Sequence, residues 1–439
     1  MKVKNLNKAT LRLTCIIALS ILAAFLVPLA ARARWASPRA VEAPVRSAAW
    51  GFWQQVSLNP YTKGMDFSPA LATQGSRVYA MWSRQVDPGG DQDYDPHYNF
   101  SIYDGDMWGP LDRNIQPTVP TSKTVNVDMA LDSTGAPHFV WAENTVTPSY
   151  TLYYSSTHIS AIQEIAHANE ALIPVIAVGN QVHVAWLQGK YDIMYSGKDI
   201  AGGAWDPAST VRHSTKSVQD PNIAVDGNTV HVVWSEGVAP DDTDIMYTNN
   251  SDWSGARRTV YQGSVYVNGI GYRPDIAARG SNVYVVWCAY KTPGEQHVRF
   301  GQSTNGGSSW STSQSISGGA LAANDNSPKY LRPGIAVDTN GKLHVAFNGS
   351  TAGVNGKEHI FYVSRKQGGA WRTRQNVTSL GLDYNNTTPA IATSSEYVHL
   401  IWARQNAPPE PTSRYDLFYS RASIVEQEGP FLPIIFKSF

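Results

Sequence analysis

The chain has 439 residues, and its 35 Lys and Arg residues balance its 35 Asp and Glu residues, so the formal net charge is zero. This balance argues against a nucleic-acid partner, because proteins that bind nucleic acids carry a strong basic excess. Hydrophobic residues at 42% exclude general disorder, while 35 Gly, 22 Tyr and 14 Trp favour strands and turns over long helices.

Residues 1–33 have the pattern of a secretory signal peptide. Basic residues precede an apolar run from Leu13 to Ala31, and Ala31-Arg32-Ala33 is a small-x-small cleavage site. The alternative is an uncleaved membrane anchor, since the run is close to the minimum length of a membrane span. Residues 34–49, rich in Ala, Pro and Arg, are predicted to be a linker. We therefore expect a secreted or extracytoplasmic protein.

A strand-like block recurs along the chain and ends each time in an aromatic residue. These aromatic residues, at intervals of 45 to 60 residues, are Trp82, Trp141, Trp186, Trp234, Trp287, Phe347 and Trp402. A shorter block, usually Pro-x-Ile-Ala, precedes each one, although the second repeat has Val127-Asp128-Met129-Ala130 instead. A third strand, such as Asp192–Ser196, follows. Four short strands in a repeat of this length are typical of a β-propeller blade.

A fourth strand completes most of these repeats. It follows Trp108, Trp205, Trp253, Trp310 and Trp371. The seventh repeat lacks it after Ser420, but the N-terminal residues Trp53–Leu58 match the pattern of Trp371–Val377. We predict an all-β fold over residues 50–424, a seven-bladed β-propeller of four-stranded blades whose ring is closed by an N-terminal strand.

Two other features accompany the repeats. Residues 425–439 form an apolar C-terminal tail, too short to span a bilayer, which is either a surface-sorting signal or a segment that docks on the domain. Of the two cysteines, Cys15 lies in the signal peptide. Cys288 follows Trp287 in a strand, so we expect it to be buried and inert.

One turn between a third and a fourth strand carries a family motif. Ser303–Trp310 resembles the Asp-box, Ser-x-Asp-x-Gly-x-x-Trp, of sialidase-like (BNR-repeat) propellers, with Asn305 in place of Asp. Ser364–Trp371 and Ser101–Trp108 keep its Ser, Gly and Trp. The role of these residues is structural, because Ser and Asx bond turn amides and Gly supplies a positive φ. The resemblance implies a sialidase-like propeller.

The resemblance also implies how an enzyme of this superfamily works. Sialidases are six-bladed and have a Phe-Arg-Ile-Pro motif, three arginines for the substrate carboxylate, a Tyr/Glu nucleophile pair and an acid/base Asp. This chain has no Phe-Arg-Ile-Pro; it has Tyr272-Arg273-Pro274 and Leu331-Arg332-Pro333 at the same place in two neighbouring blades.

The candidate ligand-binding residues belong to the loops at one face of the predicted ring. Before the first strands lie Asp220, Arg273 and Arg332, and two residues after the second-strand aromatics lie Arg84, Glu236 and Arg404. Arginines converging on one sector suit a carboxylate or a sulfate, because guanidinium binds planar anions bidentately. The alternative is that these side chains pair with the acids across the rim.

No catalytic pair, metal site or cofactor is predicted. Tyr290, Tyr384, Tyr415 and Glu236 lie in suitable loops, but no spacing links them, so the catalytic residues stay unassigned. The alternating acids from Asp91 to Asp95 favour a solvated loop over a Ca²⁺ site. Five second-strand histidines occupy equivalent positions in separate blades, which favours packing over metal binding; they are His138, His183, His231, His344 and His399.

Three functions remain open. The favoured one is a secreted, non-catalytic monomer, associated with the cell surface, that binds a glycan or an acidic polysaccharide through the arginine-bearing rim. The second is a sialidase-like glycoside hydrolase or a polysaccharide lyase. The third is a scaffold for a protein partner, which rests on the versatility of the fold. We favour binding because the fold signals are strong and the catalytic signals are degenerate.

Overall fold

The computed structural model describes residues 50, 54–56, 65–85, 94–110, 112–115, 123–146, 149–156, 162–169, 171–238, 242–253, 257–263, 270–291, 295–319, 321–322, 332–350, 357–378, 385–405 and 415–424. The predicted signal peptide, linker and C-terminal tail lie outside this part of the chain. Within it, no helix is long and apolar enough to cross a membrane.

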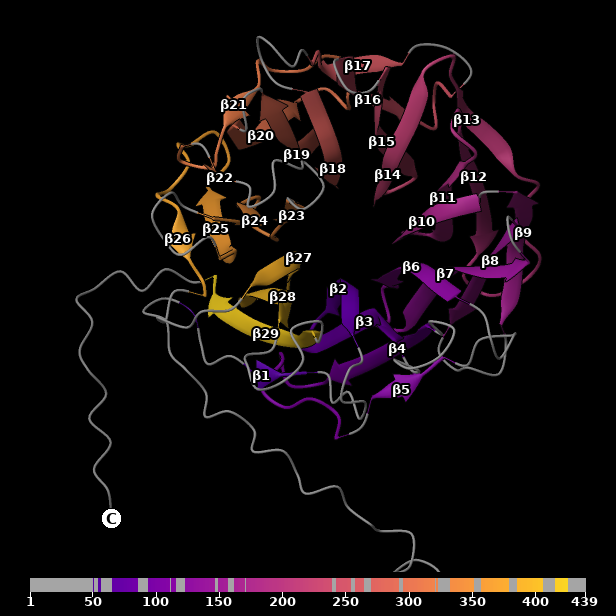
Figure 1. The fold of residues 1–439 in the computed structure, drawn as a ribbon, viewed down its shortest axis with the longest axis horizontal. Coiled ribbons are helices and arrows are strands. Elements are labelled where there is room, and N and C mark those ends of the chain that lie inside the picture. Colours follow the sequence, from indigo (N-terminus) through magenta and orange to yellow (C-terminus); the bar gives the residue numbers. More distant parts are fainter. Residues whose placement is uncertain are drawn as a thin grey trace, which may run out of the picture. The chain divides into compact units, whose positions relative to one another are not determined.

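All regular elements of the described residues are β-strands, and they form antiparallel groups of four (Figure 1). The first group is β2 (Asp66–Gln74), β3 (Arg77–Gln85), β4 (Tyr94–Ser101) and β5 (Arg113–Asn114). The second is β6 (Lys123–Leu131), β7 (Pro137–Val146), β8 (Ser149–Ser156) and β9 (Gln163–Asn169). The third is β10 (Ala171–Val178), β11 (Gln181–Gln188), β12 (Asp192–Asp199) and β13 (Ser209–His213).

The pattern continues toward the C-terminus. The next group is β14 (Ser217–Asp226), β15 (Thr229–Val238), β16 (Asp242–Asn249) and β17 (Arg258–Tyr261). It is followed by β18 (Ile270–Arg279), β19 (Asn282–Lys291) and β20 (Glu295–Ser303), with β21 (Gln314–Ser315) and β22 (Leu321–Ala322) both paired to β20. Then come β23 (Gly334–Val337), β24 (Leu343–Gly349), β25 (His359–Arg365) and β26 (Gln375–Asn376). The last are β27 (Asn386–Thr393), β28 (Tyr397–Gln405) and β29 (Tyr415–Ser423).

The groups are arranged around a common centre, with the first strand of each innermost (Figure 1). A single parallel bridge between Tyr94 and Lys123 joins the first two groups into one eight-stranded sheet. The other groups are separate sheets. Among the described residues only isolated backbone contacts cross between them, such as the parallel bridge between Met65 and Tyr415, so side-chain packing makes most of the contact between neighbouring sheets. The predicted all-β fold of four-stranded antiparallel sheets is confirmed.

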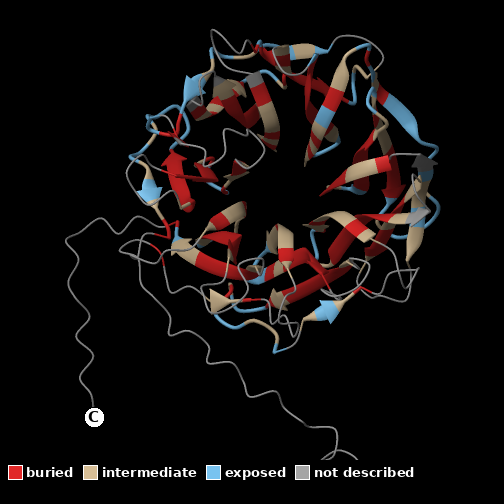
Figure 2. Cartoon of the chain, viewed as in Figure 1, coloured by how far each residue is buried: buried red, intermediate tan, exposed pale blue. Residues whose placement is uncertain are grey.

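The second strand of each group forms the core. The aromatic residues that end the recurring blocks are fully buried, because these strands have a neighbour on each edge and a packed sheet on each face. Figure 2 shows the resulting pattern, with buried residues in the middle of the sheets and exposed ones at the outer edge. Cys288 on β19 is also buried, as predicted, and burial raises the pKa of its thiol to about 12.

A strand from the N-terminus completes the last sheet. β1 (Gln54–Gln55) pairs antiparallel with β29, where Gln54 faces Tyr419 and Gln55 faces Phe418. The sheet order is therefore β1-β29-β28-β27. This is the pairing that the sequence predicts for the N-terminal strand.

The tryptophan that precedes this strand differs from the prediction. The sequence match aligns Trp53 with Trp371, whereas the structure places Trp50 in the equivalent position. Trp50 stands four residues before β1, as Trp371 stands four residues before β26. Its ring packs edge-on against Tyr362 of the neighbouring sheet, with the centroids 4.8 Å apart. The distance from the tryptophan to the outer strand thus identifies the equivalent residue better than the local sequence match.

Aromatic pairs join each of several sheets to its neighbour. A third-strand aromatic ring of one sheet meets, edge-on, the tryptophan at the outer turn of the next. The pairs are Tyr154–Trp205, Tyr195–Trp253, Tyr247–Trp310, Phe300–Trp371 and Tyr419–Trp108, with centroids 4.2 to 5.1 Å apart. Edge-on pairs of this kind add about 0.5–1.5 kcal/mol beyond their buried area.

The outer turns are built as the motif predicts. Ser303 Oγ accepts a hydrogen bond from the Gly307 amide at 2.8 Å, and Asn305 Oδ1 accepts one from the Ser309 amide at 2.9 Å. Gly307 has a φ of 87°, and a Cβ there would clash with the ring of Tyr247 from the neighbouring sheet. The Tyr247 hydroxyl in turn donates to the Gly306 carbonyl oxygen at 3.1 Å. The turn therefore needs glycine both for its φ and for the tyrosine packed on it.

The second-strand histidines have the packing role that the sequence favours. In each of five sheets the histidine Nδ1 lies 2.6 to 2.7 Å from the hydroxyl of a third-strand tyrosine. The pairs are His138–Tyr154, His183–Tyr195, His231–Tyr247, His344–Tyr362 and His399–Tyr419. Burial lowers the pKa of all five, so the rings are neutral at pH 7.

The tyrosine-over-glycine contact leads to a stability prediction. Gly306→Ala and Gly307→Ala both place alanine at a positive φ, but only Gly307 faces Tyr247, while nothing lies within 4 Å of a Cβ at Gly306. We expect Gly306→Ala to cost about 1–2 kcal/mol and Gly307→Ala about 2 kcal/mol more. Urea denaturation of both variants measures the difference. Equal losses of stability would contradict this account of the sheet contact.

Candidate functional site

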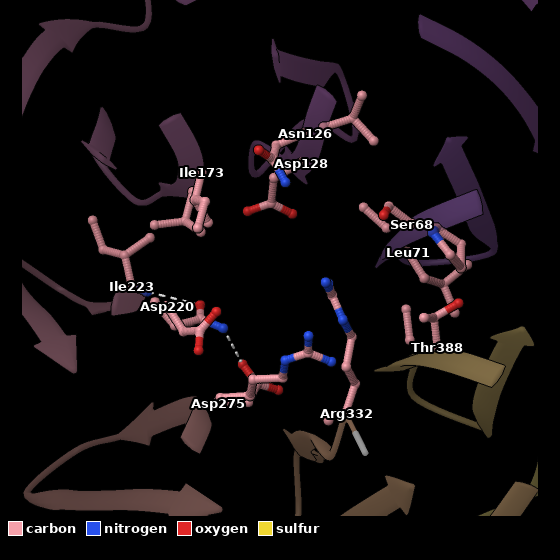
Figure 3. A pocket seen from close by; sticks show the side chains of 18 of the residues that line it. Ser68, Leu71, Asn126, Asp128, Ile173, Asp220, Ile223, Asp275, Arg332 and Thr388 are labelled. Carbon is pink, nitrogen blue, oxygen red and sulfur yellow. Dashed lines mark hydrogen bonds between the residues drawn. The ribbon is translucent and has the colours of Figure 1, made fainter. Parts of the chain in front are cut away.

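The inner strands surround a central pocket of about 360 Å³ (Figure 3). Each contributes the beginning of its first-strand block, which is Pro-x-Ile-Ala in most groups, together with the residue before the block. The lining segments are residues 68–71, 126–129, 173–176, 220–223, 273–275, 332–335 and 388–391. The pocket thus lies where the repeated first-strand motif of every group meets.

A backbone bulge aims the residue before proline into this pocket. At Ser68, Ile173, Asp220, Arg273 and Thr388 φ is 47° to 53°, and a register shift against the second strand falls at each of them. Left-handed φ is unusual for residues other than glycine, most of all for β-branched Ile and Thr. A bulge re-aims a side chain. Asp220 and Arg273 therefore lie within strands and not, as predicted, in the loops before them.

Arg332 is a largely enclosed cation of the pocket, and Figure 3 shows its side chain reaching inward. Its backbone amide donates to Asn348 Oδ1 at 3.0 Å, which fixes its position before β23. Its Nε is buried and has no hydrogen-bond partner among the described residues. Burial and, next, the charge of Arg273 lower the pKa of Arg332 to about 10, while Asp220 acts in the opposite direction.

Two aspartates on the pocket wall are absent from our sequence-based site. Asp128 accepts hydrogen bonds from the amides of Met129 and Ile176, and thereby links β6 to β10. Burial raises its pKa to about 7. Their position in the repeat could have identified them, because Asp128 and Asp275 both occupy the x of the Pro-x-Ile-Ala block or its equivalent.

Asp275 on β18 likewise links three inner strands by hydrogen bonds. Its Oδ1 accepts from Asn222 Nδ2 on β14 at 2.7 Å and its Oδ2 from the Ile335 amide on β23 at 2.7 Å. Burial raises its pKa to about 6. The carboxyls of Asp128 and Asp275 thus bind the inner strands to one another.

The other predicted rim residues lie in buried networks away from the pocket-lining residues. Arg84 is ion-paired with Asp66 at 2.7 Å and Asp112 at 2.6 Å. The buried Arg404 guanidinium lies 3.7 Å from the Phe418 ring centroid. Arg84 thus pairs with acids, which is the alternative that the sequence left open, whereas Arg404 stacks on an aromatic ring.

Glu236 on β15 is also bound, by Trp234 of its own strand and by Arg212 and Ser214 from the end of the neighbouring sheet. It accepts hydrogen bonds from Arg212 at 2.6 Å, Ser214 at 2.7 Å and Trp234 Nε1 at 2.9 Å, and these bonds lower its pKa although burial opposes them. The structure therefore brings together Asp220, Arg273 and Arg332 of the predicted set and separates them from Arg84, Glu236 and Arg404.

The remaining chemical candidates add nothing to the pocket. Tyr290 and Tyr415 are not among its described lining residues, and Tyr384, Asp91 and Asp93 lie outside the described part of the chain. The described residues contain no cluster of three or more His, Cys, Asp or Glu side chains that could hold a metal ion. The described lining offers guanidinium groups and carboxyls, which suit the recognition of a charged ligand.

Comparisons with known proteins concern the fold. No family model matches the chain, and no curated protein sequence matches it. A protein of unknown function from Dyadobacter fermentans is similar in structure, with 10% identity over 85% of this chain and 99% of that chain and a TM-score of 0.51. The chain therefore shares the fold of that protein.

Sialidases, which the outer turn resembles in sequence, are also among the similar structures. The NanB sialidase from Streptococcus pneumoniae has 11% identity over 88% of this chain and 70% of that chain, with a TM-score of 0.47. A Hadza microbial sialidase has 12% identity over 85% and 69%, with a TM-score of 0.49. These likenesses carry no conclusion about activity.

The raised pKa of Asp128 predicts a pH dependence of stability. A carboxyl whose pKa is higher in the folded than in the unfolded state loses its stabilising proton as the pH rises from about 4 to about 7. Because Asp128→Asn cannot ionise, we expect the unfolding free energy of the wild type, relative to that of the variant, to fall by about 4 kcal/mol over this window, at about 1.4 kcal/mol for each unit by which the pKa is raised. Urea titrations at about pH 4, 6 and 8 measure it. A difference that stays constant with pH would contradict the raised pKa.

Proposed function

We propose that this chain is a secreted, non-catalytic, seven-bladed β-propeller that binds the acidic group of a glycan in its central pocket. The carrying observation is the Arg332 guanidinium, which lies in the pocket next to Arg273 with its buried Nε unpartnered. Export by the segment 1–33, association with the cell surface and a monomeric state belong to the same proposal.

Two observations support seven blades in a closed ring. The lining segments of the pocket come from the inner strands of seven four-stranded groups, if the eight-stranded sheet is divided at its single bridge. The last and first groups meet through the Tyr419–Trp108 pair, in the same way as neighbours elsewhere. With β1 on the outer edge of β29, the N-terminal and C-terminal parts of the chain share one blade.

The chemistry of the pocket supports an oxyanion as the ligand group. A buried charge without a partner is costly, and a guanidinium lowers this cost best by binding a planar anion with two parallel hydrogen bonds. A carboxylate or a sulfate between Arg273 and Arg332 would also relieve the repulsion that lowers the pKa of Arg332. A volume of about 360 Å³ fits one sugar unit better than a long stretch of polymer.

The proposal predicts a loss of binding when the enclosed charge is removed. Arg332→Gln should weaken the binding of glucuronate and of a sulfated monosaccharide at least about tenfold, which corresponds to about 1.4 kcal/mol. The matched control is Arg279→Gln, which makes the same substitution outside the pocket. Arg279 is exposed at the far end of β18, and its loss changes the net charge equally. Isothermal titration calorimetry measures both.

Other results would overturn parts of the proposal. Unchanged affinity in Arg332→Gln would remove the arginine site. Hydrolysis or elimination of a sialoside or an acidic polysaccharide by the wild type, abolished in Arg332→Gln, would replace a binding function by an enzymatic one.

A further inference from the structure

Opposite charges face the central pocket without pairing with one another. Asp220 on β14, Arg273 on β18 and Arg332 before β23 come from neighbouring groups and all line it. Among the described residues none of these three side chains makes a hydrogen bond or an ion pair. They are nevertheless close enough for both Asp220 and Arg273 to act electrostatically on Arg332.

The backbone explains why these charges stay apart. Asp220 and Arg273 sit on left-handed bulges, with φ of 47° and 50°, and each is followed by a proline. Arg332 is held at its amide by Asn348. Strained backbone of this kind persists where the surrounding structure enforces it, and it is concentrated at ligand sites. The pocket is thus built with its charges separated rather than neutralised.

The sum of charges limits what the pocket accepts. Its described lining carries two guanidinium groups, on Arg273 and Arg332, and three carboxyls, on Asp128, Asp220 and Asp275. Asp128 and Asp275 are already bonded to backbone amides, and Asp275 also to Asn222. Asp220 is therefore the carboxylate left for a ligand. A purely anionic ligand would satisfy the arginines but would lie beside this unpaired negative charge.

We propose that the ligand of the central pocket is zwitterionic, with an amine beside its acidic group. The anion binds Arg273 and Arg332, and the ammonium binds Asp220, as in an acidic amino sugar whose nitrogen is not acetylated. This inference rests on the proposed function and adds to it a positively charged amine on the ligand. One small ligand then pairs all three free charges of the pocket.

A set of three monosaccharides tests this assignment. Glucuronate carries only the acid, 2-amino-2-deoxyglucuronate carries both charges, and the N-acetylated form of the latter keeps the size while losing the positive charge. Calorimetry with the full chain should give at least about tenfold tighter binding for the free amine than for either other sugar. Asp220→Asn should remove this preference, since it deletes the charge that selects the ammonium, and leave glucuronate binding equal or tighter.

Controls separate charge recognition from damage to the fold. Asp226→Asn, at the other end of β14, makes the same charge change outside the pocket lining and should keep the preference. Circular dichroism of Asp220→Asn should match that of the wild type, because the Asp220 side chain makes no bond among the described residues.

The outcomes distinguish the two proposals. If glucuronate and its free-amine analogue bind equally and both depend on Arg332, the zwitterion is overturned while the acidic-glycan site stands. If the preference survives in Asp220→Asn, the assigned carboxylate is wrong and the inference fails. If none of the three sugars binds, the proposed function fails together with the inference.

Discussion

The shape of the central pocket depends on contacts made far from it, where a tyrosine of one sheet lies on the turn glycine of the next. Only isolated backbone contacts join neighbouring sheets in the described part of the chain, such as the bridge between Tyr94 and Lys123 and the hydrogen bond from the Asn386 amide to the Glu358 carbonyl oxygen. The angle between sheets is therefore set by side-chain packing, such as that of Tyr247 on Gly307 and Tyr419 on Gly105. Because the sheets radiate from a common centre, small changes at these outer contacts move the inner strands relative to one another.

Most of this architecture could be predicted from the sequence because two separate sequence patterns mark each repeat. The second-strand blocks give the period, and the outer-turn motif gives the place where each sheet meets its neighbour. The misalignment of Trp53 shows the limit of local matching. Trp50 takes that place because the tryptophan must contact the Tyr362 ring. Whether a tryptophan makes this contact depends on the conformation of the turn, which a local sequence match does not describe.

The site was predictable only where the repeat itself marks it. Asp220, Arg273 and Arg332 stand before the proline of the first-strand block, and at Asp220 and Arg273 the bulge turns that position inward. Arg84 was predicted from its spacing after Trp82, but it lies directly opposite Asp66 in the sheet register and pairs with it. Register across strands is a tertiary property, so the sequence pattern could not distinguish a pocket arginine from a paired one.

At the bulge before proline, the backbone conformation does not depend on which residue occupies the position. Serine, isoleucine, aspartate, arginine and threonine all adopt nearly the same φ at this position, at Ser68, Ile173, Asp220, Arg273 and Thr388. The same bulge therefore accommodates small polar, β-branched, acidic and basic side chains without a change of backbone conformation. The chemistry presented to the central pocket can therefore change by point substitution at this position, while the rest of the repeat keeps its role in folding.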